Sequence, residues 1–122
     1  MKKLFFITLT IIIFFTISCT EDFTNPKVLS GTTWRCSTFS EDDWMKNEYE
    51  YVEMRFISTT KVEGWAKWID GDLSQSGSTN YTISGNTITL ISESSNLTET
   101  GVIDKETITI NELGHKLVFI KQ

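Results

Sequence analysis

The 122-residue chain has two cysteines and one histidine, and both shortages exclude classes of protein. Two cysteines cannot build the disulfide framework of a small secreted scaffold, so hydrophobic packing must hold the fold together. The one histidine, His115, lies in a predicted turn, where a solvated side chain is a better interpretation than a catalytic base. Acidic residues outnumber basic ones, 16 to 11, and the basic residues form no cluster, which argues against nucleic-acid binding.

Two acidic segments are the other candidates for chemistry. Glu41–Asp43 offers paired carboxylates, but adjacent residues in a loop are poorly held for glycoside chemistry, so a solvated loop is the better interpretation. Asp70–Ser76 has oxygen atoms at alternate positions, as in a calcium loop. Gln75, however, stands where such a loop requires glycine, and Tyr81 stands where it requires a bidentate glutamate. We therefore expect no metal site, no cofactor and no enzymatic activity.

The longest hydrophobic run lies at the N-terminus. Lys2 and Lys3 precede an uncharged stretch, Leu4–Ile17, which is shorter than the roughly 20 apolar residues of a membrane-spanning helix. A short basic segment followed by an apolar one of this length is what the secretory machinery recognises. Residues 1–18 are therefore predicted to be a cleaved signal peptide.

The residues at the predicted cleavage point, Thr16-Ile17-Ser18-Cys19, resemble a bacterial lipobox. The resemblance implies that the Cys19 thiol receives a diacylglycerol, that the peptide is cut before it, and that the new amine is acylated, with palmitate among the expected chains. Because each buried methylene contributes about 0.8 kcal/mol, several acyl chains hold a protein almost permanently. The alternative is an ordinary signal peptide with an incidental Cys19.

The residues directly after Cys19 indicate to which membrane the lipoprotein is sent. In such lipoproteins an aspartate directly after the cysteine favours inner-membrane retention, whereas this chain has Thr20 followed by Glu21-Asp22. The acidic pair resembles the export signal of surface lipoproteins in some Gram-negative bacteria. We expect an outer-membrane protein, anchored at Cys19 and followed by a polar tether over residues 19–31. Residues 32–122 are then the folded domain.

Alternating hydrophobic and β-branched residues predict an all-β domain. A loop is expected over Asp70–Thr79, a helical turn near 41–48, and a bulge near Tyr51-Val52. The short spacing between strands suits an antiparallel barrel or sandwich, with up-and-down pairing as the simplest connection. The eight expected strands are Trp34–Phe39, Tyr49–Ser58, Lys61–Ile69, Tyr81–Ile83, Ile88–Leu90, Leu97–Ile103, Thr107–Ile110 and Leu117–Ile120.

Three segments resemble the small lipocalin-like domains found on bacterial lipoproteins. They are Gly31-Thr32-Thr33-Trp34, which opens the first strand, the hairpin Tyr81–Leu90, and the closing Lys116–Lys121. The resemblance implies an eight-stranded antiparallel up-and-down β-barrel, a fold that is compatible with the binding of a small ligand. It also implies that Trp34 packs under a basic residue of the last strand, here Lys121, to seal one barrel end.

The aromatic residues are the candidates for binding. Trp34, Tyr51, Phe56, Trp68 and Tyr81 are predicted to line an apolar pocket inside the barrel. The alternative is that Trp34, Phe56 and Trp68 simply fill the core.

The alternation of faces assigns a direction to three side chains. Trp68 shares its face with Val62 and Ala66 and is expected to point inward. Trp65 shares its face with charged residues, so it is expected to be accessible and to anchor a protein partner. Cys36, on the face of Trp34, is expected to be a buried, inert thiol.

These expectations favour a non-enzymatic binding module at the outer membrane, either for a small apolar ligand or for another envelope protein. A structural or assembly accessory without a ligand is the alternative from a different class.

The anchoring is tested by replacing Cys19 with alanine. Because lipidation requires the thiol at this position, Cys19→Ala should yield an uncleaved or soluble product. Membrane fractionation measures this. If the variant is fully processed and still partitions with membranes like the parent chain, the lipoprotein assignment is wrong.

Overall fold

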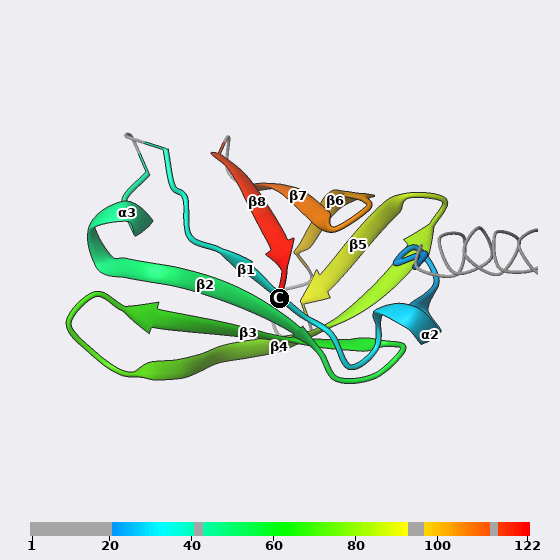
Figure 1. Cartoon of the computed structure of the whole chain (residues 1–122), viewed down its shortest axis with the longest axis horizontal. Coiled ribbons are helices and arrows are strands. Elements are labelled where there is room, and N and C mark those ends of the chain that lie inside the picture. Colours follow the sequence, from blue (N-terminus) through cyan, green and yellow to red (C-terminus); the bar gives the residue numbers. More distant parts are fainter. Residues whose placement is uncertain (1–20, 41–42, 93–96, 113–114) are drawn as a thin grey trace, which may run out of the picture.

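The computed structural model describes residues 21–40, 43–92, 97–112 and 115–122. In these residues eight antiparallel strands form a closed barrel, in which each strand pairs with its sequence neighbours and β8 returns to β1 (Figure 1). The strands are β1 (Thr33–Cys36), β2 (Tyr49–Phe56), β3 (Lys61–Trp68), β4 (Leu73–Ser84), β5 (Thr87–Ser92), β6 (Thr98–Asp104), β7 (Thr107–Glu112) and β8 (His115–Lys121). The expectation of an all-β, eight-stranded up-and-down barrel is confirmed.

Two short helices complete this part of the chain, α2 (Pro26–Leu29) and α3 (Met45–Glu48). The helical turn expected near residues 41–48 is therefore present as α3. None of the described helices is long and apolar enough to cross a membrane. The predicted signal peptide and Cys19 lie outside the described residues.

The alternation of side chains along each strand sets the two barrel faces. On β8, Leu117 and Phe119 are buried inside the barrel, whereas Val118 and Ile120 are exposed on its surface. The bulge expected near Tyr51 is confirmed, because the β2–β3 register shifts between Tyr49 and Tyr51.

Strand β4 differs from the sequence prediction. The segment Asp70–Thr79, expected to be a loop, contributes most of its residues to β4 and pairs with β3, with Gln75 opposite Trp65 and Ser78 opposite Glu63. Almost all side chains in the first half of β4 are exposed, so this half has no hydrophobic alternation to reveal it. Backbone pairing with β3 holds it in the sheet.

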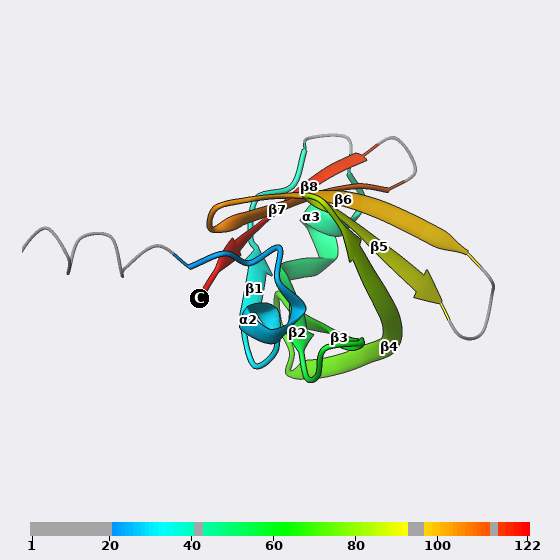
Figure 2. The same cartoon turned by 90° about the vertical axis from the view of Figure 1, so that its right-hand side faces the viewer.

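One end of the barrel is closed by the residues that precede β1. Figure 2 shows α2 and the chain before it lying beside β1 and β2 at this end. Although residues 21–31 were expected to be a polar tether, Phe23 and Leu29 are buried in the core, at 5% and 0% exposure. We call this the closed end; the opposite end, which carries α3 and the turn after β3, is the open end.

The closing segment is held by local hydrogen bonds. Asn25 caps α2, its side-chain oxygen accepting from the Lys27 amide at 3.1 Å, and Pro26 occupies the first helical turn, where its missing N–H costs nothing. Gly31 follows with a positive φ of 85°, a conformation that glycine adopts without strain. Its amide donates to the Phe56 carbonyl at 2.6 Å, which ties the segment to β2.

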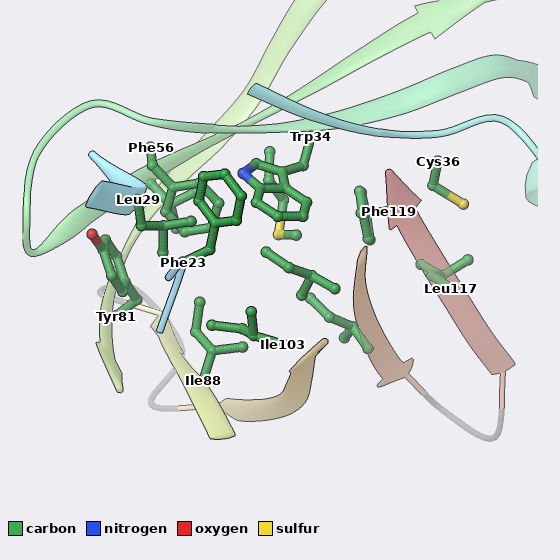
Figure 3. Packing of buried hydrophobic residues seen from close by; sticks show 14 residues of the cluster. Phe23, Leu29, Trp34, Cys36, Phe56, Tyr81, Ile88, Ile103, Leu117 and Phe119 are labelled. Carbon is green, nitrogen blue, oxygen red and sulfur yellow. The ribbon is translucent and has the colours of Figure 1, made fainter. Parts of the chain in front are cut away.

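Trp34 is the centre of the closed end (Figure 3). It is fully buried, its ring meets Phe23 edge to face at 5.2 Å, and its Nε1 donates to Thr32 Oγ1 at 2.8 Å. Lys121 pairs with Trp34 in the strand register, but its Nζ lies 5.6 Å from the centroid of the Phe23 ring. The ring that packs against Trp34 at this end is thus that of Phe23, and the direct packing of Trp34 under Lys121 stays a prediction.

Truncating Trp34 tests this packing. Trp34→Ala should lower the free energy of unfolding by about 3–5 kcal/mol, because it leaves a cavity where a large aromatic side chain was buried. Urea unfolding of residues 20–122 measures the loss. Ile120→Ala, on the exposed face of β8, is the matched control and should change stability by less than about 0.5 kcal/mol. A loss under about 1 kcal/mol for Trp34→Ala would contradict the packing.

Candidate functional site

The interior of the barrel is hollow toward the open end. A cavity of about 250 Å³ lies there, and a second hollow of about 330 Å³ adjoins it. The two share part of their walls: Gly64, Ser76, Leu90 and Glu99. The first cavity is lined mainly by apolar side chains, among them Met45, Val52, Met54, Leu90, Ile110, Leu117 and Phe119.

The character of the lining decides what the cavity accepts. Aliphatic, methionine and phenylalanine side chains suit an apolar ligand, and a few polar groups at the wall give it an orientation. Those groups include the Ser76 hydroxyl and the Glu99 carboxylate, which also has another polar partner in the protein. Among the described lining residues of either hollow there is no lysine, arginine or histidine, so neither hollow offers a cation to a ligand carboxylate.

Small residues on β3 help to keep this half open. Gly64 lines both hollows, and a Cβ atom there would lie 2.9 Å from Ser76 Oγ. Any side chain at position 64 would therefore displace the Ser76 hydroxyl.

Three of the five predicted pocket residues lie together at the closed end. Trp34, Phe56 and Tyr81 are all buried, and the Phe56 and Tyr81 rings meet edge to face at 5.0 Å. Tyr81 donates its hydroxyl to the Ser58 carbonyl at 2.8 Å, and burial raises the pKa of that hydroxyl. These three side chains fill the core rather than line the hollow. For Trp34 and Phe56 this matches the alternative that the sequence left open, but Trp68, the third residue of that alternative, is exposed.

The other two predicted pocket residues lie outside the barrel interior. The Tyr51 ring is on the outer surface of β2, covered by the Arg35 guanidinium at 3.9 Å from its centroid. Trp68 is 42% exposed and packs on Tyr49 at 4.8 Å between ring centroids.

The expected accessibility of the two tryptophans on β3 is wrong. Trp65 does lie on the outer face, donating from Nε1 to Glu63 at 3.1 Å, but the Arg55 guanidinium covers its ring at 4.2 Å. It is therefore partly buried, while Trp68 is exposed. Trp68 continues the inward row of Val62 and Ala66, yet it ends β3, where the packed interior has already stopped. The role of Trp65 in partner binding stays a prediction.

A charged network on the outer face was not expected from the sequence. Glu53 is 3% exposed; its Oε1 accepts from Arg35 at 2.7 Å and its Oε2 from Arg55 at 3.0 Å. Both guanidiniums also cover aromatic rings, those of Tyr51 and Trp65. Stacking of two arginines on aromatic rings and their hydrogen bonds to the two Glu53 oxygens thus bury a carboxylate on the barrel surface. The strand register brings these side chains together, and the sequence alone does not specify that register.

Cys36 and His115 both lie near the buried carboxylate of Asp43, toward the open end. Cys36 is 1% exposed, and burial, with a smaller contribution from Asp43, raises the pKa of its thiol above the usual 9.0. The unfolded chain therefore loses this proton at lower pH than the folded one, so the thiol's contribution to stability falls as the pH rises above 9.0. A protonated, buried thiol is a poor nucleophile, as expected for an inert cysteine.

Only one of the two Asp43 carboxylate oxygens accepts a hydrogen bond. Its Oδ1 accepts from the Met45 amide at 3.0 Å, whereas its Oδ2 lies 3.9 Å from His115 Nδ1, too far for a hydrogen bond. His115 begins β8 instead of lying in a turn, with a third of its side chain exposed. Among the residues the structure places, no group of three or more histidine, cysteine or acidic side chains is arranged to hold a metal ion.

Comparison of the chain with family models, with curated proteins and with solved structures finds no match. The closed, eight-stranded antiparallel barrel is compatible with a lipocalin-like fold. Function must therefore be argued from the cavity and the surface of this chain.

Proposed function

We propose that the protein is a lipid-anchored, non-enzymatic binding module of the bacterial outer membrane that holds a small apolar ligand in the open half of its barrel. The observation that carries the proposal is the contrast between the two halves of the interior. The closed end is filled by large side chains such as Trp34, whereas the open end has an apolar cavity of about 250 Å³. Ligand sites are hollows of this kind with a few polar groups.

The position of the proposed anchor supports this function. The chain enters the barrel at the closed end, where Phe23 is buried, only a few residues after Cys19. A lipid at Cys19 would hold the closed end toward the membrane and leave the cavity at the far side. A ligand or another envelope protein would then reach the open end without passing the anchor.

The ligand is expected to be apolar and without a carboxylate. No described lysine, arginine or histidine lines either hollow, so an anionic head group there would lose its water without gaining a cation. A neutral or cationic polar tip fits this lining better than the acid group of a fatty acid.

Filling the cavity tests the proposal. Leu90 lines both hollows, so Leu90→Trp should occupy the space a ligand needs. The neutral dye N-phenyl-1-naphthylamine should bind residues 20–122 saturably, with its fluorescence rising, and Leu90→Trp should weaken that binding about tenfold or more.

The matched control is the neighbouring residue. Ile91→Trp adds the same bulk on the exposed face of β5 and should leave dye binding unchanged. Far-ultraviolet circular dichroism checks that both variants keep the barrel. Equal dye affinity in the parent chain, Leu90→Trp and Ile91→Trp would exclude the cavity as the binding site.

A further inference from the structure

Three aromatic rings form a continuous surface at the open end. Tyr49 begins β2 and lies between Trp44, 5.8 Å away, and Trp68, 4.8 Å away, measured between ring centroids. The two tryptophans are 57% and 42% exposed, and Ile69 beside them is 48% exposed. We call Trp44, Tyr49 and Trp68 the aromatic edge; it lies beside α3 and the end of β3, toward the left of Figure 1.

Backbone contacts fix the position of these rings. Tyr49 and Trp68 are register partners, and the Ile69 amide donates to the Glu48 carbonyl at 3.1 Å. The turn after β3 is tied by Lys67, whose Nζ donates to the Trp68 carbonyl at 2.8 Å and to the Gly71 carbonyl at 2.7 Å. Because the rings are positioned in advance, a partner that stacks on them loses little conformational freedom in doing so.

Exposed carboxylates lie close to the aromatic edge in sequence. Glu48, Asp70 and Asp72 are all exposed and stand within four residues of Tyr49 or Trp68. Glu50 and Lys67 are 3.3 Å apart and compensate each other, and Lys46 also has a partner. Exposed rings with an acidic rim favour a cation, which is attracted both by the ring faces and by the carboxylates.

We propose that the aromatic edge docks an arginine- or lysine-rich segment of another protein. Guanidinium groups stack on tryptophan and tyrosine faces, as Arg35 and Arg55 of this chain already do on Tyr51 and Trp65. The acidic rim and the negative net charge of the chain, −5, oppose an anionic lipid surface and a second copy of the same face. This proposal goes beyond the ligand cavity and uses different residues.

The probe is a fluorescein-labelled peptide of eight arginines, and its anisotropy is followed with the full chain purified in a non-ionic detergent. Trp44→Ala and Trp68→Ala should each weaken the affinity about three- to thirtyfold, since each removes a ring but no charge. Trp44 is more than half exposed, so its replacement leaves the barrel intact.

Two double variants that remove the same charge at different places distinguish docking at the aromatic edge from general electrostatic attraction to the acidic chain. Asp70→Asn with Asp72→Asn removes two charges at the rim, and Asp104→Asn with Glu106→Gln removes two exposed charges at the closed end. The rim pair should weaken peptide binding at least threefold more than the distant pair. Equal effects of the two pairs, or tryptophan variants that bind like the parent chain, would overturn the proposal.

Two other occupants are tested in parallel. Vesicles of phosphatidylcholine would shift the tryptophan emission of the parent chain, but not of Trp44→Ala, if the edge docked a membrane. Sedimentation would reveal a dimer that Trp44→Ala abolishes if the edge bound a second copy. Either result would also overturn the proposal, which predicts neither.

Discussion

Trp34 and Phe23 meet edge to face at 5.2 Å where the chain enters the barrel, and the rest of the structure depends on this contact. A barrel formed by about 90 residues without a disulfide must exclude water from its interior by packing alone. Phe23 and Leu29, from outside the sheet, complete that packing at the closed end. The three largest fully buried side chains, Trp34, Tyr81 and Phe56, lie there, whereas the half of the interior beyond Met54 contains a cavity.

The two barrel ends therefore differ in what they do. The closed end is packed with buried side chains and lies next to the proposed lipid anchor. The open end offers an apolar cavity inside and, at its rim, three aromatic rings of which two are exposed. Between them, the pair of Glu53 with Arg35 connects β2 to β1 on the outer face, and Arg55 holds the same carboxylate from within β2. A buried carboxylate that kept only one of these partners would be costly, so the network also favours one register of the strands.

Much of the fold was predictable because a strand with one buried face alternates between buried and exposed side chains, as Leu117 to Ile120 do on β8. The first half of β4 was missed because it is polar and exposed on both faces, and backbone pairing leaves no pattern in the sequence. Phe23 and Leu29 were missed because an irregular segment has no period. The burial of Trp68 was predicted wrongly, since burial depends on where the packed interior ends, whereas alternation indicates only the direction of a side chain. The cavity itself depends on side-chain volumes summed across several strands, which no single segment reveals.

The central claim is that the interior is packed at one end and hollow at the other, and xenon binding tests it most directly. Xenon enters apolar cavities without needing polar partners. A crystal structure of residues 20–122 under xenon pressure should show a xenon atom among Val52, Leu90 and Leu117, and none between Trp34 and Phe56. Xenon at the closed end, or an open half filled by side chains with no xenon in it, would contradict the account.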